Sequence, residues 1–445
     1  MSKKLIKTLA LLLMFTIFLV TLAACGSSDS NNGVADNGVS ENNAAGNNQS
    51  DDVSPDETPD SGKKVALTHW SGFTGPDRPY LEQLIEEFNE TSPTTSIELS
   101  VMEWDILDQK LTASFATGTG PDFFSYGPEI MGKYNDMGAL IDISEIYEGR
   151  VDISILPESV TEVPIFDGKT VASPMCVFGS MLYVNLDLLE DAGYTEPPST
   201  QEELFEYAKN LVKKDDNGDV TQFGLFMDYT DVFQHFYWGH GLEAVDMDAN
   251  KAIVNSEDGI ALVERLKDLV LIDGVSPPTG DKATLFTSGK LAMYAQGPWD
   301  TTGAADAGIN FDVVPIPGGP EAHMIPGHPI FYIPTIAIGD NIDHFYEWQE
   351  FWLSKESQAV WAAGTGYPAM RVDMADDPGL EGTWAAKFSQ SADLFTVRNF
   401  ATHKNSGRIF DEVLRNAWEA VVLEQGSVEE ILNNAAVEID GYLSE

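Results

Sequence analysis

Basic residues are scarce in this chain of 445 residues. Lysine and arginine together number 25, against 71 aspartates and glutamates, which gives a formal net charge of −46. A surface this acidic repels nucleic acids and other phosphate-rich molecules over long range, so no nucleic-acid partner is expected. The charge does not indicate a fold.

Cysteine is nearly absent, since the chain has only Cys25 and Cys176. Cys25 falls in a targeting segment, so no internal disulfide is expected and the stability of the folded part must come from its core. Cys176 lies between Met175 and Val177 and is predicted to be a small buried hydrophobe.

Metal-ligand patterns are also lacking. His235 and His240 are five residues apart, without cysteines or ordered carboxylates close by, so neither a metal nor a cofactor is expected. The run Asp215–Asp219 lacks the glycine spacing and the distant glutamate of an EF-hand loop. We interpret it as an Asn-Gly turn, with a bound calcium ion as the alternative.

The N-terminal apolar run, Leu9 to Leu22, is short for a membrane span, although an uncleaved helix is the alternative. It follows three lysines and ends in Leu-Ala-Ala-Cys-Gly at 22–26, which is typical of a signal peptide followed by a lipidated cysteine. We therefore predict a signal peptide over 1–24 and a lipid on Cys25. Residues 25–63 have almost no large apolar side chains and are predicted to form a disordered tether.

An α/β pattern begins at Val65, and the length of the chain favours two domains. The segment VALTHW is a predicted strand, and Tyr80 to Asn89 is a predicted amphipathic helix. Trp70, Ser71 and Phe73 come at the carboxyl end of that strand, where open α/β sheets bind ligands. They are candidate ligand contacts, although Trp70 also suits a core position.

The stretch Leu285 to Asp300 contains a second predicted buried strand, Leu291 to Ala295. Gly297-Pro298 ends this strand, because proline cannot donate to a ladder. Trp299 and Asp300 then follow at its carboxyl end. An indole beside a carboxylate suits a sugar, which offers one apolar ring face and many hydroxyls. A core tryptophan at a turn is the alternative.

Three segments resemble a known family. FTSGKLAMYAQGPWD at 286–300, LTASFATGTGPDFFSYGPEIMGKYNDMGALIDI at 111–143, and the segment at 165–211 are similar to the family 1 extracellular solute-binding proteins. These proteins are the sugar-capturing subunits of ABC importers. The resemblance implies a type II periplasmic-binding-protein fold of class α/β, in which two lobes with mixed sheets flanked by helices enclose a ligand cleft.

The resemblance also implies site residues. Tyr126 falls where maltose-binding proteins have a stacking aromatic residue, and Phe410 falls near another. Glu129 falls at a sugar-binding carboxylate, although a first-turn helix charge is the alternative. Phe178 replaces an acidic residue of the maltose-binding proteins, which argues against maltodextrin as the ligand. Trp238, in an aromatic-rich stretch, and Arg371, after the last crossing, complete the candidates.

In the family, three crossings join the lobes. We place them near 177–180, 316–319 and 366–369, which assigns 64–176 and 317–368 to the first lobe and 177–316 and 369–445 to the second. Further predicted elements are strands at 172–184, 311–316 and 331–338, and helices at 345–363, 388–424 and from 428 to the end.

These observations predict a monomeric lipoprotein on the outer face of the cell membrane. By closing its lobes it would capture a di- or oligosaccharide and deliver it to an ABC-transporter permease. A cell-surface glycoside hydrolase is the alternative from another class, although no motif singles out its pair of carboxylates. Capture of a non-sugar solute by the same fold is the third possibility.

Overall fold

The computed structural model describes residues 64–445, except 278, 320–324 and 392–394. These residues lie within one compact unit, Pro59–Glu445. The predicted signal peptide, the predicted lipid site at Cys25 and the predicted tether lie outside the described residues.

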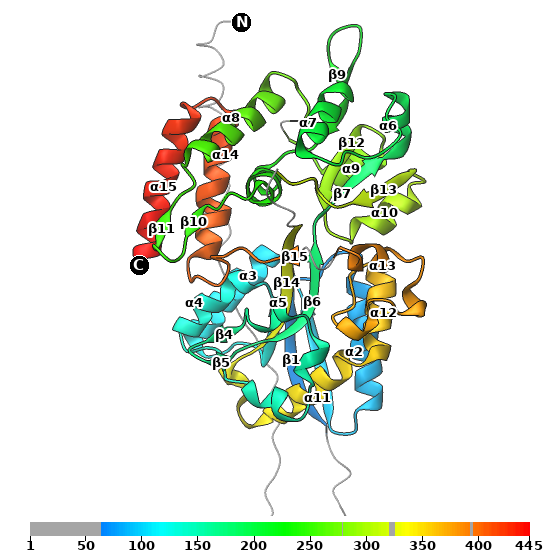
Figure 1. Ribbon diagram of the computed structural model, residues 1–445. Helices are drawn as coiled ribbons and strands as arrows, with labels where there is room; N and C mark the ends of the chain where they lie inside the picture. The colour runs from blue at the N-terminus through cyan, green and yellow to red at the C-terminus, as the bar shows by residue number, and fades with distance from the viewer. Residues whose placement is uncertain (1–63, 278, 320–324, 392–394) are drawn as a thin grey trace, which may run out of the picture. The chain divides into compact units, whose positions relative to one another are not determined.

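The first lobe is built on a six-stranded mixed sheet (Figure 1). Its strands run in the order β15-β14-β3-β1-β2, and β6 also pairs with β14. Strands β1, β2 and β3 are parallel, whereas β14 runs antiparallel to β3 and β6. The bounds are β1 Val65–Ser71, β2 Thr95–Val101, β3 Phe123–Tyr126, β6 Ser173–Gly179, β14 Ile325–Pro334 and β15 Phe395–Thr396.

Helices cover the first sheet because their apolar residues recur at helical spacing. Helix α2 (Arg78–Thr91) buries Leu81, Leu84, Ile85 and Phe88, the four residues that the amphipathic pattern predicts. The other helices of this lobe include α3 Trp104–Thr117, α4 Met131–Asp136, α5 Glu158–Thr161, α11 Ile342–Trp352 and α12 Lys355–Thr365.

The second lobe is built on a five-stranded mixed sheet in the order β13-β7-β12-β9-β8. Its central strand, β12 (Leu291–Gln296), is buried at its first five residues, as the apolar run predicts. The other strands are β13 Phe311–Val314, β7 Met181–Asn185, β9 Val220–Leu225 and β8 Lys213–Lys214. The helices include α7 Gln201–Asn210, α8 Glu257–Leu271, α9 Lys282–Thr287, α10 Asp300–Asp306, α14 Arg415–Val422 and α15 Val428–Ser444.

The two sheets are joined directly by β6 and β7 (Figure 1). The sequence predicts one long strand over 172–184, but Ser180 separates two strands that belong to different sheets. The observed architecture has mixed sheets flanked by helices, which confirms the predicted α/β fold class. Cys176 is fully buried in β6, as predicted.

Several predicted elements need correction. The predicted helix 388–424 is instead a series that contains β15, a π-helix at Arg408–Leu414 and α14. The predicted helix 345–363 is two helices, because Ser354 caps a new one by accepting from the Ser357 amide. Strand β14 begins at Ile325, earlier than predicted, because Pro326 pairs with Thr396 of β15 and Pro329 pairs with Val177 of β6.

The boundary predicted at residue 369 does not coincide with the packing. Helix α13 (Trp384–Ser389) packs on α12 of the first lobe, while Trp384 stacks on Phe311 of the second at 4.8 Å between ring centroids. Strand β15 then pairs with β14 in the first sheet. A two-residue strand has no periodicity that a sequence could display.

One apolar core fills the first lobe and continues along one face of the second sheet, where it includes Tyr183 and Tyr294. A second core lies on the other face of the second sheet and includes Leu182 and Val184. None of the helices in the described part of the chain combines the length and the apolar character that crossing a membrane requires.

Candidate functional site

A cleft of about 1280 Å³ lies between the two lobes, among side chains from both. The first lobe contributes the loop after β1, the start of α3, the end of β3 and part of β14. The second contributes Tyr229, Trp299 and the π-helix at 408–414. The volume exceeds that of most pockets for drug-sized ligands, so more than one sugar ring can be accommodated.

Aromatic rings form one region of the cleft. Phe73 and Trp104 meet edge to face with centroids 5.5 Å apart, and Tyr126 meets Trp104 at 5.3 Å. Phe178 contacts both Trp299 at 4.9 Å and Tyr367 at 5.4 Å. Phe178 and Trp299 come from β6 and from the turn after β12, so these contacts bring the two lobes together.

Two of these indoles rest on glycines. A Cβ atom at Gly72 would lie 2.1 Å from the Trp104 ring, and one at Gly297 would lie 2.1 Å from the Trp299 ring. Any side chain at either glycine would therefore displace the indole. The lack of a side chain at these two glycines thus makes room for both indoles.

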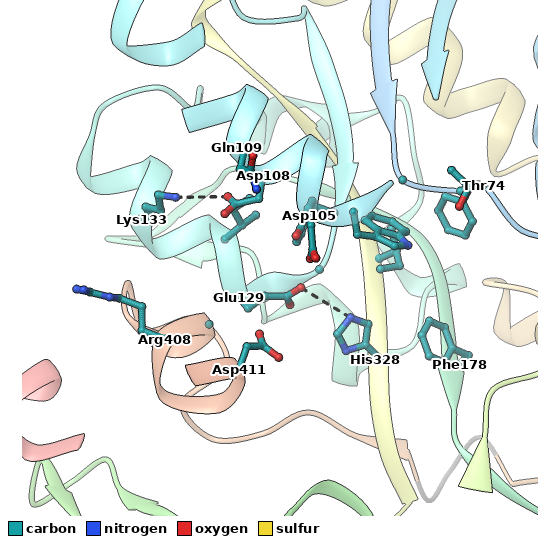
Figure 2. Close-up of a pocket in the computed structure, with 18 of the residues that line it drawn as sticks. Thr74, Asp105, Asp108, Gln109, Glu129, Lys133, Phe178, His328, Arg408 and Asp411 are labelled. Carbon is teal, nitrogen blue, oxygen red and sulfur yellow. Dashed lines mark hydrogen bonds and ion pairs between the residues drawn. The ribbon is translucent and has the colours of Figure 1, made fainter. Parts of the chain in front are cut away.

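Charged side chains form the other region, shown in Figure 2. Lys133 pairs with Asp108 at 3.4 Å, and His328 Nε2 lies 3.9 Å from a Glu129 oxygen. Asp411, from the second lobe, directs its carboxylate toward the space beside Glu129 (Figure 2). The Tyr229 hydroxyl donates to Asp411 at 2.9 Å.

Burial shifts the protonation of several groups here. It raises the pKa of the Asp77 carboxyl and of the Asp411 carboxyl, and it lowers the pKa of the His328 imidazole. His328 is therefore neutral at pH 7 and can either donate or accept a hydrogen bond. The cleft combines apolar ring faces with carboxylate acceptors, which is the chemistry that a polyhydroxylated ligand requires.

Five of the candidate residues from the sequence line this cleft: Phe73, Tyr126, Glu129, Phe178 and Trp299. The structure brings them together from segments that are far apart in the chain. Their contact with a ligand remains a proposal.

The other candidates do not line the cleft. Trp70 lies beneath Lys110, whose Nζ is 3.8 Å from the ring centroid, and Ser71 is buried. Asp300 points back along the chain and accepts a hydrogen bond from the Tyr294 hydroxyl at 3.1 Å. Trp238 is buried and donates to Glu243 at 3.0 Å.

The last two candidates, Arg371 and Phe410, contact other residues of the protein outside the cleft lining. Arg371 pairs with Asp373 at 2.8 Å and donates to the Leu353 carbonyl at 2.8 Å. Phe410 is buried against Tyr229 and lies under the guanidinium of Arg398, 3.9 Å from the ring centroid. It stands one residue before Asp411, which does line the cleft.

Sequence reasoning missed several lining residues. Trp104 follows β2 at the carboxyl edge of the same sheet as Trp70, so the strand-end rule applied to Trp70 would also have found it. His328 and Asp411 had no such indication, because they come from an antiparallel strand and a π-helix with no local motif.

The described residues contain no group of three or more histidines, cysteines, aspartates or glutamates that could hold a metal ion. At Asp215–Asp219 the Asp215 carboxylate accepts from the amides of Asn217 and Asp219, at 2.9 and 3.0 Å. This is the geometry of a turn stabilised by its own side chain.

A family model described as bacterial extracellular solute-binding protein matches residues 83–388. The chain belongs to this family. The resemblance seen in the sequence is thereby confirmed, and binding a solute outside the cytoplasm is the family's activity.

Curated relatives match this solute-binding protein along most of its length. A binding protein of Brucella abortus is 24% identical over 401 residues, which cover 86% of this chain and 94% of the relative. A maltooligosaccharide ABC transporter solute-binding lipoprotein of Streptococcus pneumoniae is 24% identical over 395 residues, covering 81% and 79%.

Solved structures show the same fold. An ABC substrate-binding protein of Listeria monocytogenes, in complex with cycloalternan, aligns with a TM-score of 0.75 at 19% identity. The alignment covers 86% of this solute-binding protein and all of that chain. At this identity the likeness establishes the fold, which confirms the periplasmic-binding-protein architecture.

Proposed function

We propose that this solute-binding protein captures a carbohydrate in the cleft between its lobes and presents it to an ABC-transporter permease. The observation that supports this most is the set of aromatic rings beside carboxylates, with rings from both lobes. Stacking a sugar face on an aromatic ring is worth about 1 kcal/mol beyond the buried area. Each carboxylate can accept hydrogen bonds from two hydroxyls.

The relatives support the same ligand class. The pneumococcal relative is named for maltooligosaccharides, and the Listeria structure contains cycloalternan. Both are oligosaccharides, and a cleft of about 1280 Å³ suits a ligand of that size. We propose a di- or oligosaccharide for this chain.

The proposed mechanism is closure of the lobes. Ligand contacts on both walls favour the closed state, because only a difference in affinity between two conformations can shift their balance. The crossing at Gly179–Ser180, between β6 and β7, is short and has small side chains that can absorb changes in backbone angle. The crossing near 316–319 would move with it. So would the return to the second lobe, which lies after β15 and not at the predicted 366–369.

We propose that the chain is a binding protein and performs no hydrolysis. Incubating it with each sugar that binds, and analysing the mixture by chromatography, should return the sugar intact. The appearance of shorter products would support the hydrolase alternative.

Anchoring completes the proposal. Leu-Ala-Ala-Cys at 22–25, after a short apolar run, and the pneumococcal relative named a lipoprotein both support a lipid on Cys25. The folded part would then act at the outer face of the cell membrane.

The test of the function is a thermal-shift screen of the chain without residues 1–25. Mono-, di- and oligosaccharides are compared with amino acids, peptides and polyamines. A specific rise in melting temperature with one sugar class supports the proposal, since a ligand stabilises the state that binds it. A shift with non-sugar solutes alone would overturn it.

A further inference from the structure

The cleft lining has an excess of negative charge. Seven of its side chains are carboxylates and four are basic. The carboxylates are Asp77, Asp105, Asp108, Glu129, Asp136, Asp411 and Glu412. The basic residues are Lys133, Lys404, Arg408 and Arg415.

Each of the four basic side chains lies near a carboxylate of the protein. The pairs are Lys133–Asp108 at 3.4 Å, Lys404–Asp136 at 3.9 Å, Arg408–Glu445 at 3.6 Å and Arg415–Asp411 at 4.0 Å. An anionic ligand would have to compete with these carboxylates for every cation in the lining.

Two of the carboxylates have uncharged neighbours and an oxygen without a hydrogen-bond partner among the described residues. Glu129 and Asp77 each have one buried oxygen without a hydrogen-bond partner among the described residues. The neighbour of Glu129 is His328 at 3.9 Å, and the partner of Asp77 is the Tyr367 hydroxyl at 3.2 Å. Both neighbours are uncharged at pH 7, because burial lowers the pKa of His328 and raises that of Tyr367.

One further cation lies behind the lining. Arg398 is stacked on Phe410 at 3.9 Å and interacts with Glu129 and Asp411 through its charge. It does not line the cleft, and five cations would still leave carboxylates in excess. The field inside the cleft is therefore negative, and the low-dielectric walls of a cleft strengthen such a field.

We propose that this cleft selects its sugars by charge. It accepts neutral oligosaccharides and oligosaccharides that carry an amine, and it rejects acidic ones such as uronates and sugar phosphates. Hydroxyl or ammonium groups can donate to Glu129 and Asp411, whereas an added carboxylate brings a like charge into the site. This inference rests on the proposed function, because it specifies the sugar class of the same cleft.

The first test uses each neutral sugar found by the screen. Its primary hydroxyls are oxidised to carboxylates, and a matched sample is converted to the amide, which has nearly the same shape without the charge. Calorimetry should show the acid binding at least tenfold more weakly than the amide, with the gap shrinking at high salt. Equal or tighter binding of the acid would overturn the proposal, as would a screen in which acidic sugars bind best.

A variant locates the effect. In Glu129→Gln the difference in affinity between the acid and the amide should become smaller. The same difference should persist in Glu82→Gln, a change on the exposed face of α2 outside the cleft lining. An affinity difference between acid and amide that is identical in both variants would contradict the role given to Glu129.

A second test needs no ligand. Met137 lines the cleft and is 48% exposed, so Met137→Cys, in the chain without residues 1–25, places a reactive thiol there. Cationic and anionic methanethiosulfonate reagents are compared at this thiol and at Ile165→Cys, which is exposed outside the lining. The preference for the cationic reagent should be several-fold larger at position 137.

The buried Cys176 is left in place in both variants as an unreactive background. An equal preference for the cationic reagent at positions 137 and 165 would contradict a negative field inside the cleft. If no sugar binds in the screen, the proposed function fails, while the reagent comparison still decides the charge of the cleft.

Discussion

Trp299 is the residue for which sequence and geometry agree most closely. The Gly297-Pro298 stop that the sequence displays does end β12, and the indole then rests on Gly297 against Phe178. The ring is only partly buried, so one part of it remains free for a ligand.

We predict that Trp299→Ala weakens binding of the cognate sugar by several kcal/mol, which is typical of a hot-spot aromatic residue. Calorimetry measures the loss, and Trp299→Phe should retain part of the affinity. Melting curves of the empty protein are the control. Retained affinity together with a collapse of apo stability would show that Trp299 belongs to the core.

A second prediction concerns the glycine under Trp104. Gly72→Ala should weaken sugar binding at least tenfold, because the new methyl group and the indole cannot occupy the same space. The matched control is Gly303→Ala in α10, where a Cβ meets no atom within 4 Å. There the change should leave binding intact and raise stability by up to about 1 kcal/mol. Equal affinity in the two variants would argue against a role for Trp104.

At the level of single residues, the sequence could indicate strand-end side chains but not where they point. Trp70 and Asp300 satisfy the same rule as Trp104 and Trp299, yet Trp70 lies under Lys110 and Asp300 faces Tyr294. Asp411 depends on the packing of a π-helix from the far end of the chain. Such placements follow from tertiary contacts, which no local pattern encodes.

Among the elements, the crossing between β6 and β7 matters most for function. The long apolar run at 172–184 predicted strand here, and all five residues of β7 are indeed buried. The apolar run alone does not show the break at Ser180, whereas the resemblance predicted a crossing near 177–180, and Ser180 separates the two sheets. Helices with a clear apolar face, such as α2 and α15, were predicted nearly to their ends, whereas the π-helix at 408–414 was predicted as ordinary helix.

We predict that ligand binding closes the lobes by rotation near 177–180, 316–319 and 397–399, because the chain leaves the first sheet after β15 and Asn399 already donates to the Val245 carbonyl of the second lobe. Small-angle scattering of the chain without residues 1–25 should show a smaller radius of gyration when the sugar is saturating. A non-binding sugar of similar size serves as the control. An unchanged radius would indicate a rigid cleft or a hinge elsewhere.

For the whole molecule, acidity sets the response to pH. Burial raises the pKa of Asp77, Asp228 and Asp300, so the folded state binds protons more tightly than the unfolded chain. Stability therefore increases as the pH falls toward these raised values. By contrast, hydrogen bonds lower the pKa of Asp281 and Asp373, so the stability from these groups is lost at lower pH, as they become protonated.

We predict that the melting temperature rises between about pH 7.5 and pH 5 and falls again below about pH 4, as measured by calorimetry at constant ionic strength. Asp77→Asn should remove part of the rise, whereas the exposed Asp216→Asn should not. A melting temperature that falls steadily from pH 7.5 to pH 5 would contradict this assignment.

Attachment to a membrane is also a property of the whole chain. We predict that Cys25→Ser, expressed in a bacterium that processes lipoproteins, releases the protein from the membrane fraction. Fractionation and immunoblotting measure the distribution, with Cys176→Ala as the control that stays attached. A Cys25→Ser protein that remains in the membrane fraction would favour an uncleaved N-terminal helix.

The place of β14 has a consequence for how the protein is made. This strand lies between β3 and β6 in the first sheet, although nearly 200 residues of chain separate it from β3. During synthesis or export, β1, β2 and β3 emerge early and then wait for β14 before their sheet can be completed. In the second sheet, shorter stretches of chain separate the paired strands β7, β9, β12 and β13. The lobe that begins first is therefore finished late, and its exposed β3 edge is the surface that a chaperone would need to protect.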